Sequence, residues 1–157
     1  MICFTERGAW VCRRLFHKLK ETGEECEAII PKRFLREEWK KEGLKEREEE
    51  FLSQWTGKMF AEKRAMIFVS ATGIAVRAIA PWIRDKMTDP PVVTVDEGAQ
   101  FVIPLLSGHV GGANELARHI ADWLEAVPVI TTATDVNGKF AVDLFASAYH
   151  MTIIDRK

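Results

Sequence analysis

The sequence lacks the features that would place it in a membrane or an oxidising compartment. No apolar run is long enough to span a bilayer, and residues 1–5 are too few, and too soon followed by charge, for a signal peptide. Cysteine is scarce: Cys3, Cys12 and Cys26 are scattered and odd in number, which favours reduced thiols over a disulfide framework. These features predict a cytoplasmic protein without a membrane partner.

A large charge of either sign is absent as well. The formal net charge is −1 at pH 7, so no overall field draws the chain to nucleic acid. Familiar phosphate-binding and metal-binding motifs are missing: G-x-x-x-x-G-K-[ST], G-x-G-x-x-G after the first apolar segment, H-E-x-x-H and C-x-x-C. Ser107 does not lie in a G-x-S-x-G nucleophile elbow either. The sequence therefore predicts no nucleic-acid partner and no metal held by the protein.

What the sequence does contain is a regular alternation of apolar segments. Its 157 residues, of which 47% are hydrophobic and 29% charged, suffice to bury the core of one domain. Apolar runs predict strands over residues 2–5, 26–31, 66–71, 92–95, 101–106 and 127–130. Helical spacing of apolar residues predicts helices over 8–22, 44–63, 74–80, 116–124 and 140–150.

This order predicts a single α/β domain over residues 1–157. We expect a layered, Rossmann-like, mostly parallel sheet flanked by helices. The short connection between residues 95 and 101 indicates a hairpin at 92–106, which would make the sheet mixed. Residues 32–50 carry charges of both signs, and for them a solvated surface is favoured over a docking surface.

Three polar loops, residues 71–73, 107–114 and 131–135, each follow a predicted strand. Ligands of open α/β sheets bind outside the carboxyl ends of the strands, so we expect these loops to converge on one site. A lone arginine, Arg77, lies on the apolar helix after the first loop and is either an ion-pair partner or a carboxylate clamp.

The loop at 107–114 is the centre of the predicted chemistry. It has three glycines, which allow close backbone approach to a ligand, and a histidine, His109, suited to proton transfer near neutral pH. The N–H groups of Gly111 and Gly112 could hold a developing oxyanion or a ligand carboxylate. The alternative is a tight turn that His109 pins by a hydrogen bond. His119 lies on the polar face of the next helix, and we predict a surface position for it.

Three strings in this sequence resemble segments of the cobalamin-biosynthesis protein CbiG family. They are A-T-G-I-A-V-R-A-I-A-P at 71–81, L-L-S-G-H-V-G-G-A-N at 105–114, and V-I-T-T-A-T-D at 129–135 followed by F-A-V-D at 140–143. They occur in the family's order and together cover about residues 66–145.

The resemblance implies a hydrolase of the anaerobic route to cobalamin (vitamin B12). Such an enzyme opens the ring-A δ-lactone of cobalt-precorrin-5A and releases acetaldehyde, giving cobalt-precorrin-5B. The expected partner is a corrinoid tetrapyrrole, and no cofactor is expected because the substrate carries the cobalt. The family's C-terminal domain is not contained in residues 1–157, so a separate chain or a homo-oligomer could complete the enzyme.

On this resemblance, His109 and Asp135 are the candidate catalytic residues. The candidate substrate-binding residues are hydrogen-bond donors of the three loops and the first helix after them: Thr72, Gly73, Arg77, Ser107, Gly108, Gly111, Gly112, Asn114, Thr131, Thr132 and Thr134. Two other functions stay open. One is a non-catalytic tetrapyrrole-binding module or partner subunit of a split enzyme, and the other is a generic α/β phosphate or nucleotide binder.

Overall fold

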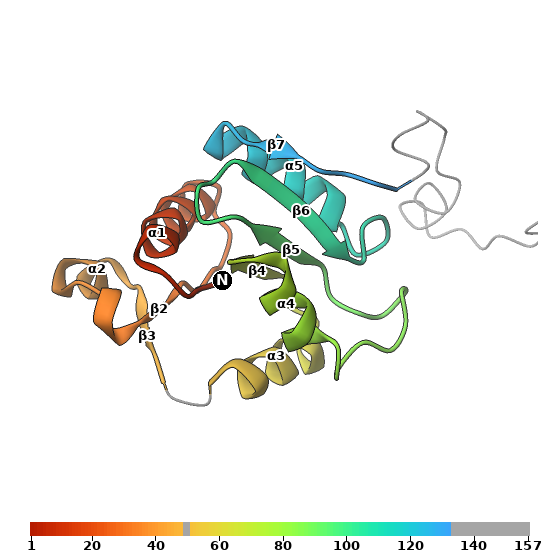
Figure 1. Ribbon diagram of the computed structural model, residues 1–157, viewed down its shortest axis with the longest axis horizontal. Helices are drawn as coiled ribbons and strands as arrows, with labels where there is room; N and C mark the ends of the chain where they lie inside the picture. Colours follow the sequence, from red (N-terminus) through yellow and green to blue (C-terminus); the bar gives the residue numbers. More distant parts are fainter. Residues whose placement is uncertain (49–50, 133–157) are drawn as a thin grey trace, which may run out of the picture.

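The computed structural model describes residues 1–48 and 51–132, which form a seven-stranded sheet between two layers of helices (Figure 1). The strand order is β3-β2-β1-β4-β5-β6-β7. The strands are β1 (Ile2–Cys3), β2 (Ile29–Pro31), β3 (Lys45–Arg47), β4 (Met66–Val69), β5 (Val92–Val95), β6 (Phe101–Leu106) and β7 (Val127–Pro128). The predicted α/β fold is confirmed.

The direction of the strands changes once. Strands β1 to β5 are parallel to their neighbours, β6 is antiparallel to β5, and β7 is parallel to β6. The predicted hairpin at 92–106 is therefore confirmed, and the sheet is mixed. Because Val92 at the start of β5 pairs with Leu106 at the end of β6, the chain leaves β6 at the edge where β5 begins.

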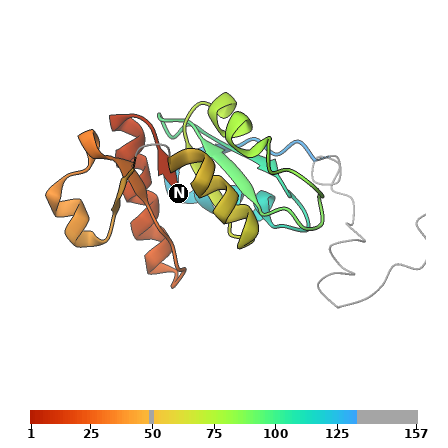
Figure 2. The same ribbon diagram turned by 90° about the horizontal axis from the view of Figure 1, so that it is seen from below.

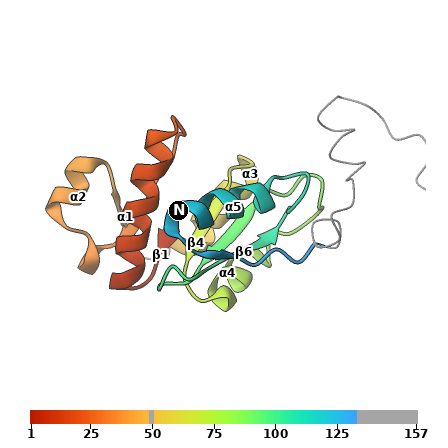
Figure 3. The ribbon, with the colours of Figure 1, turned by 90° about the horizontal axis from the view of Figure 1, so that it is seen from above.

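The helices cover the two faces of the sheet in pairs. Helices α1 (Glu6–Glu21) and α5 (Ala113–Leu124) share one core cluster, and α3 (Phe51–Ala61) and α4 (Thr72–Ile79) share the other. Strand β4 serves both, since Ile67 and Val69 belong to the first cluster and Met66 and Phe68 to the second. Figure 2 shows the sheet with α3 in front, and Figure 3 shows it from the opposite side with α5 in front.

Local signals account for the first helix. The Thr5 side chain caps α1 by accepting the Gly8 N–H at 3.0 Å, and the predicted apolar face of Cys12, Leu15 and Leu19 is buried. No helix in the described residues is long and apolar enough to cross a membrane.

One predicted element is wrong at its start. Residues 44–47 do not begin a helix: α2 (Glu37–Glu42) ends at Gly43, whose φ is +107°, and β3 follows. The Lys45 N–H donates to the Ala28 carbonyl at 2.8 Å, and β3 pairs with β2. Residues 45–47 therefore form a strand because β2 supplies backbone hydrogen bonds, although their charged side chains are not typical of a strand. The predicted helix at 140–150 lies outside the described residues.

The β5–β6 hairpin is held by one carboxylate. Asp96 Oδ1 accepts the N–H groups of Gln100 and Phe101, and Oδ2 accepts that of Gly98, at 2.6 to 2.9 Å. These three bonds satisfy the donors of a turn whose Ala99 adopts a φ of +54°.

We expect Asp96→Ala to destabilise the domain by about 2 kcal/mol, because three backbone donors lose a charged acceptor. Urea denaturation monitored by circular dichroism measures the loss. Glu97→Ala, an exposed neighbour in the same turn, is the control and should leave the midpoint unchanged. Equal midpoints for the two variants would contradict this role of Asp96.

A second carboxylate joins α1 to α2. Glu42 accepts bonds from Arg13 Nε at 2.7 Å and Nη2 at 2.8 Å, and His17 Nε2 lies 3.0 Å from it. The hydrogen bonds from Arg13, followed by the contact with His17, lower the pKa of Glu42 to about 2.

The lowered pKa of Glu42 predicts a dependence of stability on pH. The ionised carboxylate favours the folded state above the ordinary glutamate pKa of about 4.3, and this contribution is lost as the pH falls toward 2. In denaturant titrations between pH 5 and 2, Glu42→Gln should therefore lose stability less steeply than the wild type. Glu38→Gln, on the exposed side of α2, should follow the wild-type slope.

Candidate functional site

The glycine-rich loop after β6 folds back onto the start of α5. The N–H of Ala113 donates to the Ser107 carbonyl at 3.1 Å, and the N–H of Asn114 donates to the Gly108 carbonyl at 3.0 Å. Ser107 has a φ of +57°, and its hydroxyl donates to the Asp89 carbonyl at 2.7 Å. The loop is thus tied both to the helix and to the connection before β5.

Each glycine of this loop is explained by a close neighbour or by its backbone angle. A Cβ on Gly108 would lie 2.7 Å from Asn114 Oδ1, and one on Gly111 would lie 2.8 Å from the Ser107 carbonyl oxygen. Gly112 has a φ of +84°, which disfavours other residues. The tight turn that the sequence left as an alternative is therefore real, whatever ligand the loop holds.

These bonds limit the predicted oxyanion site. The Gly112 N–H donates to the His109 carbonyl at 3.1 Å, and the next two N–H groups are used by the loop itself. Of the two glycine N–H groups proposed as donors, only that of Gly111 remains available within the described part of the chain. His109 is half-buried.

Two of the three predicted loops come together. Asn114 is 5% exposed, and its Nδ2 donates to Thr132 Oγ1 at 2.8 Å. Thr131, beside it, is exposed. Strand β7 pairs with the first two residues of β6 and is parallel to it, so the chain after β7 continues toward the carboxyl end of β6, where Thr132 meets Asn114. Thr134 and Asp135 lie outside the described residues.

The predicted convergence of the third loop is wrong. Residues 71–73 follow the carboxyl end of β4, whereas the 107–114 loop lies at the edge where β4 and β5 begin. The four residues of β4 separate the two edges by about 13 Å. Thr72, Gly73 and Arg77 therefore occupy the opposite edge, where Arg77 is exposed and donates to the Gly73 carbonyl at 3.1 Å.

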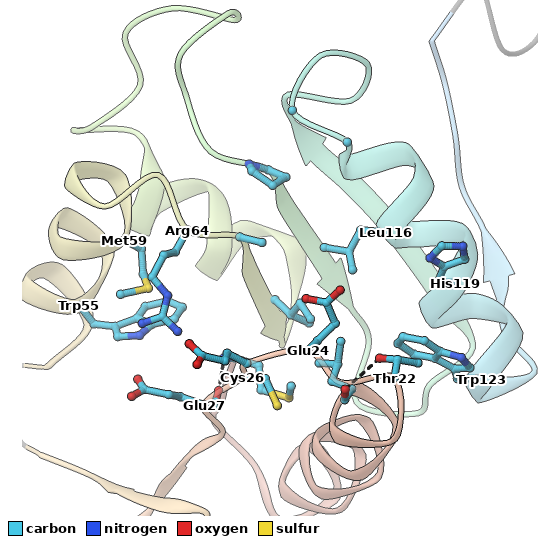
Figure 4. Close-up of a pocket in the computed structure, with 18 residues that line it drawn as sticks. Thr22, Glu24, Cys26, Glu27, Trp55, Met59, Arg64, Leu116, His119 and Trp123 are labelled. Carbon is cyan, nitrogen blue, oxygen red and sulfur yellow. Dashed lines mark hydrogen bonds between the residues drawn. The ribbon is translucent and has the colours of Figure 1, made fainter. Parts of the chain in front are cut away.

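A cleft of about 750 Å³ opens beside the 107–114 loop (Figure 4). It lies where β1, β4 and β5 begin, with Met59, Trp55 and Arg64 on one side and Leu116, His119 and Trp123 of α5 on the other. Gly111 and Gly112 line it, but His109 does not. Within the described ranges, no three His, Cys, Asp or Glu side chains gather as a set that could hold a metal ion.

Sequence reasoning missed most of this cleft. It placed Trp55 and Met59 in the core, and they are 5% and 4% exposed, yet they also form one wall. It placed His119 on the surface, and the ring is 55% exposed, but it lies on the cleft wall with Nε2 3.2 Å from Glu115 Oε1. The available signal was that Arg64 and Pro91 lie one or two residues before buried strands, which places both at the edge where the parallel strands begin.

Gly111→Ala should destabilise the domain by about 2 kcal/mol, because its Cβ would meet the Ser107 backbone, which cannot move without the loop. Thermal unfolding followed by circular dichroism measures this. Gly73→Ala is the matched control: its Cβ would meet only the flexible Arg77 guanidinium, so the midpoint should stay or rise. A midpoint for Gly111→Ala equal to that of the control would contradict the packing role.

The sequence is similar to those of known proteins. The chain is 59% identical over 87 residues to the cobalt-precorrin-5A hydrolase of Salmonella typhimurium, covering 55% of this chain and 25% of that protein. It is 48% identical over 91 residues to the cobalt-precorrin-5A hydrolase of Priestia megaterium, covering 58% and 24%. The matched part thus spans about a quarter of the length of these curated relatives.

A solved structure and a family model agree with these relatives. A cobalamin biosynthesis protein G homolog from Sulfolobus solfataricus has a TM-score of 0.57 and 25% identity, covering 92% of this chain and 38% of that one. The model of the family "Cobalamin synthesis G N-terminal" matches residues 54–135, just over half of the chain. That stretch holds the glycine-rich loop, the helix α5 and most of the cleft wall, and the chain belongs to the cobalamin synthesis G N-terminal family.

Proposed function

We propose that this chain forms the N-terminal, macrocycle-binding part of a cobalt-precorrin-5A hydrolase. The observation that carries the proposal is the 107–114 loop, because it lies within the family match and two of its glycines line the cleft. Two relatives that share this part of the chain are named for that activity. The cobalt belongs to the substrate in this proposal, and the protein supplies binding and proton transfer.

The reaction needs water to attack the lactone carbonyl. His109 takes the proton of the water as its oxygen bonds to the acyl carbon, and the Gly111 N–H donates to the resulting oxyanion. The acyl–oxygen bond then breaks, leaving a carboxylic acid and an alkoxide. The alkoxide oxygen becomes the carbonyl of acetaldehyde as the carbon–carbon bond to the macrocycle breaks. The electron pair of that bond stays on the macrocycle, which takes up the proton that the imidazole removed from water.

The Asn114–Thr132 hydrogen bond has a supporting role. It joins the start of α5 to the segment after β7. Asp135 stays a candidate base on the resemblance alone. The imidazole of His119 is a competing base, because it reaches the cleft wall that His109 does not.

The test is to incubate the purified chain, without oxygen, with cobalt-precorrin-5A and to trap acetaldehyde. His109→Ala should lower the rate about a hundredfold if this imidazole transfers the proton. His17→Ala is the control, since that side chain lies beside Glu42 on the surface between α1 and α2 and outside the site. His119→Ala measured in parallel decides between the two imidazoles: a loss with His119→Ala alone would contradict the role of His109.

The remaining outcomes separate the functions. Acetaldehyde release that depends on either histidine supports a hydrolytic site within this chain. Macrocycle binding without release would support the non-catalytic tetrapyrrole-binding part of a two-chain enzyme and overturn independent catalysis. Neither binding nor release would overturn the proposed function, and thermal stabilisation by a nucleotide would then favour the generic anion binder.

A further inference from the structure

The cleft between α3 and α5 is lined by both apolar and charged side chains. Its apolar wall is built by Trp55, Met59, Leu116 and Trp123. Aromatic and aliphatic side chains of this kind favour a flat apolar ligand, and a volume of about 750 Å³ is in the range of small-molecule sites. Figure 4 shows these side chains facing one another across the opening.

Among the described residues that line the cleft, Arg64 is the only lysine or arginine. Its backbone is fixed, because the Arg64 N–H donates to the Met59 carbonyl at 3.0 Å where α3 ends and β4 begins two residues later. Its side chain is 39% exposed, and Nη1 lies 3.8 Å from a Glu62 oxygen, too far for a strong ion pair. The guanidinium therefore keeps donors for a ligand oxygen.

The connection between α1 and β2 adds three glutamates to the lining, Glu24, Glu25 and Glu27. Figure 4 shows Glu27 on the same side of the cleft as Arg64, and Glu24 nearer to Leu116. Glu27 is already compensated: Lys45 Nζ lies 2.6 Å from its Oε1, and the pKa of Glu27 is lowered by Lys45 first and by Arg64 in smaller part. Glu24 and Glu25 are exposed, so their charge is screened by solvent but still repels an anion. Arg64 is thus the side chain of the lining that attracts an anion, whereas Glu24 and Glu25 oppose its binding.

We infer that this cleft is the ligand site of the domain and takes a flat, apolar, carboxylate-bearing molecule, with one carboxylate on Arg64 and the ring between α3 and α5. The identification of that molecule as the corrinoid rests on the proposed function. Its chemical class rests on the residues that line the cleft. Arg64 holds an anionic group of the ligand, and the carboxylates of Glu24 and Glu25 weaken this binding by repulsion.

Two probes test the inference on the intact chain: cobalt-precorrin-5A, followed by its absorbance, and 8-anilinonaphthalene-1-sulfonate, a flat apolar anion, followed by its fluorescence. Arg64→Gln should weaken both about tenfold, because a charge-assisted hydrogen bond is lost. Lys63→Gln removes the same charge from the adjacent exposed residue and should change neither affinity. The double variant Glu24→Gln, Glu25→Gln should tighten binding of both probes.

The outcomes separate this inference from the proposed function. Binding of cobalt-precorrin-5A that is unchanged in Arg64→Gln would overturn the cleft site and leave the proposed function standing. Binding of the dye alone, still dependent on Arg64, would support the cleft as a site for flat anions and overturn the corrinoid assignment. Arg64→Lys should restore part of the affinity, whereas equal losses in Arg64→Gln and Arg64→Lys, with a lowered unfolding midpoint, would overturn the ligand role.

Discussion

The reversal of the chain between β5 and β6 decides where the candidate residues of the 107–114 loop lie. Asp96 holds that reversal by accepting three backbone N–H groups at the turn. Because β6 runs against β5, its end lies at the edge where the parallel strands begin. The glycine-rich loop and the start of α5 lie there beside the cleft, and Thr132, after β7, meets them through Asn114. A parallel β6 would have carried the same loop to the edge that holds Thr72 and Arg77.

Periodicity predicted the parts of the fold whose cause is local. The apolar face of α1 and the two-sided burial of β4 follow from side chains that are close in the sequence. The strand β3 was not predictable in this way, because its stabilising hydrogen bonds come from β2 across the sheet. The hairpin was predicted, and because it makes β6 antiparallel to β5, the carboxyl end of β6 lies at the opposite edge from the carboxyl end of β4. The rule that ligands bind at the carboxyl ends of strands brings loops together only where the strands are parallel.

In the site too, the motif alone suggested more ligand contacts than the structure leaves available. The three glycines of the 107–114 loop suggested close approach of a ligand, yet each is also required by a neighbouring atom or by its φ angle. The N–H groups at the start of a helix suggested an anion site, yet most donate to carbonyls of the same loop. What remains for chemistry is narrower: the Gly111 N–H, the imidazoles of His109 and His119, and the cleft with Arg64.

The family strings at 71–81 and 105–114 lie at opposite edges of the sheet, so a single ligand bound at one edge does not contact both. The string at 71–81 builds α4, where Ala75, Ala78 and Ile79 pack on the second core cluster and Arg77 stays on the surface. Packing alone accounts for those alanines and the isoleucine, so this string does not need a ligand to explain its apolar part. The string at 105–114 contributes directly to the cleft through Gly111 and Gly112. A ligand seated against Arg64 therefore meets the second string and not the first, and a contact at Arg77 would require a different surface or a different molecule.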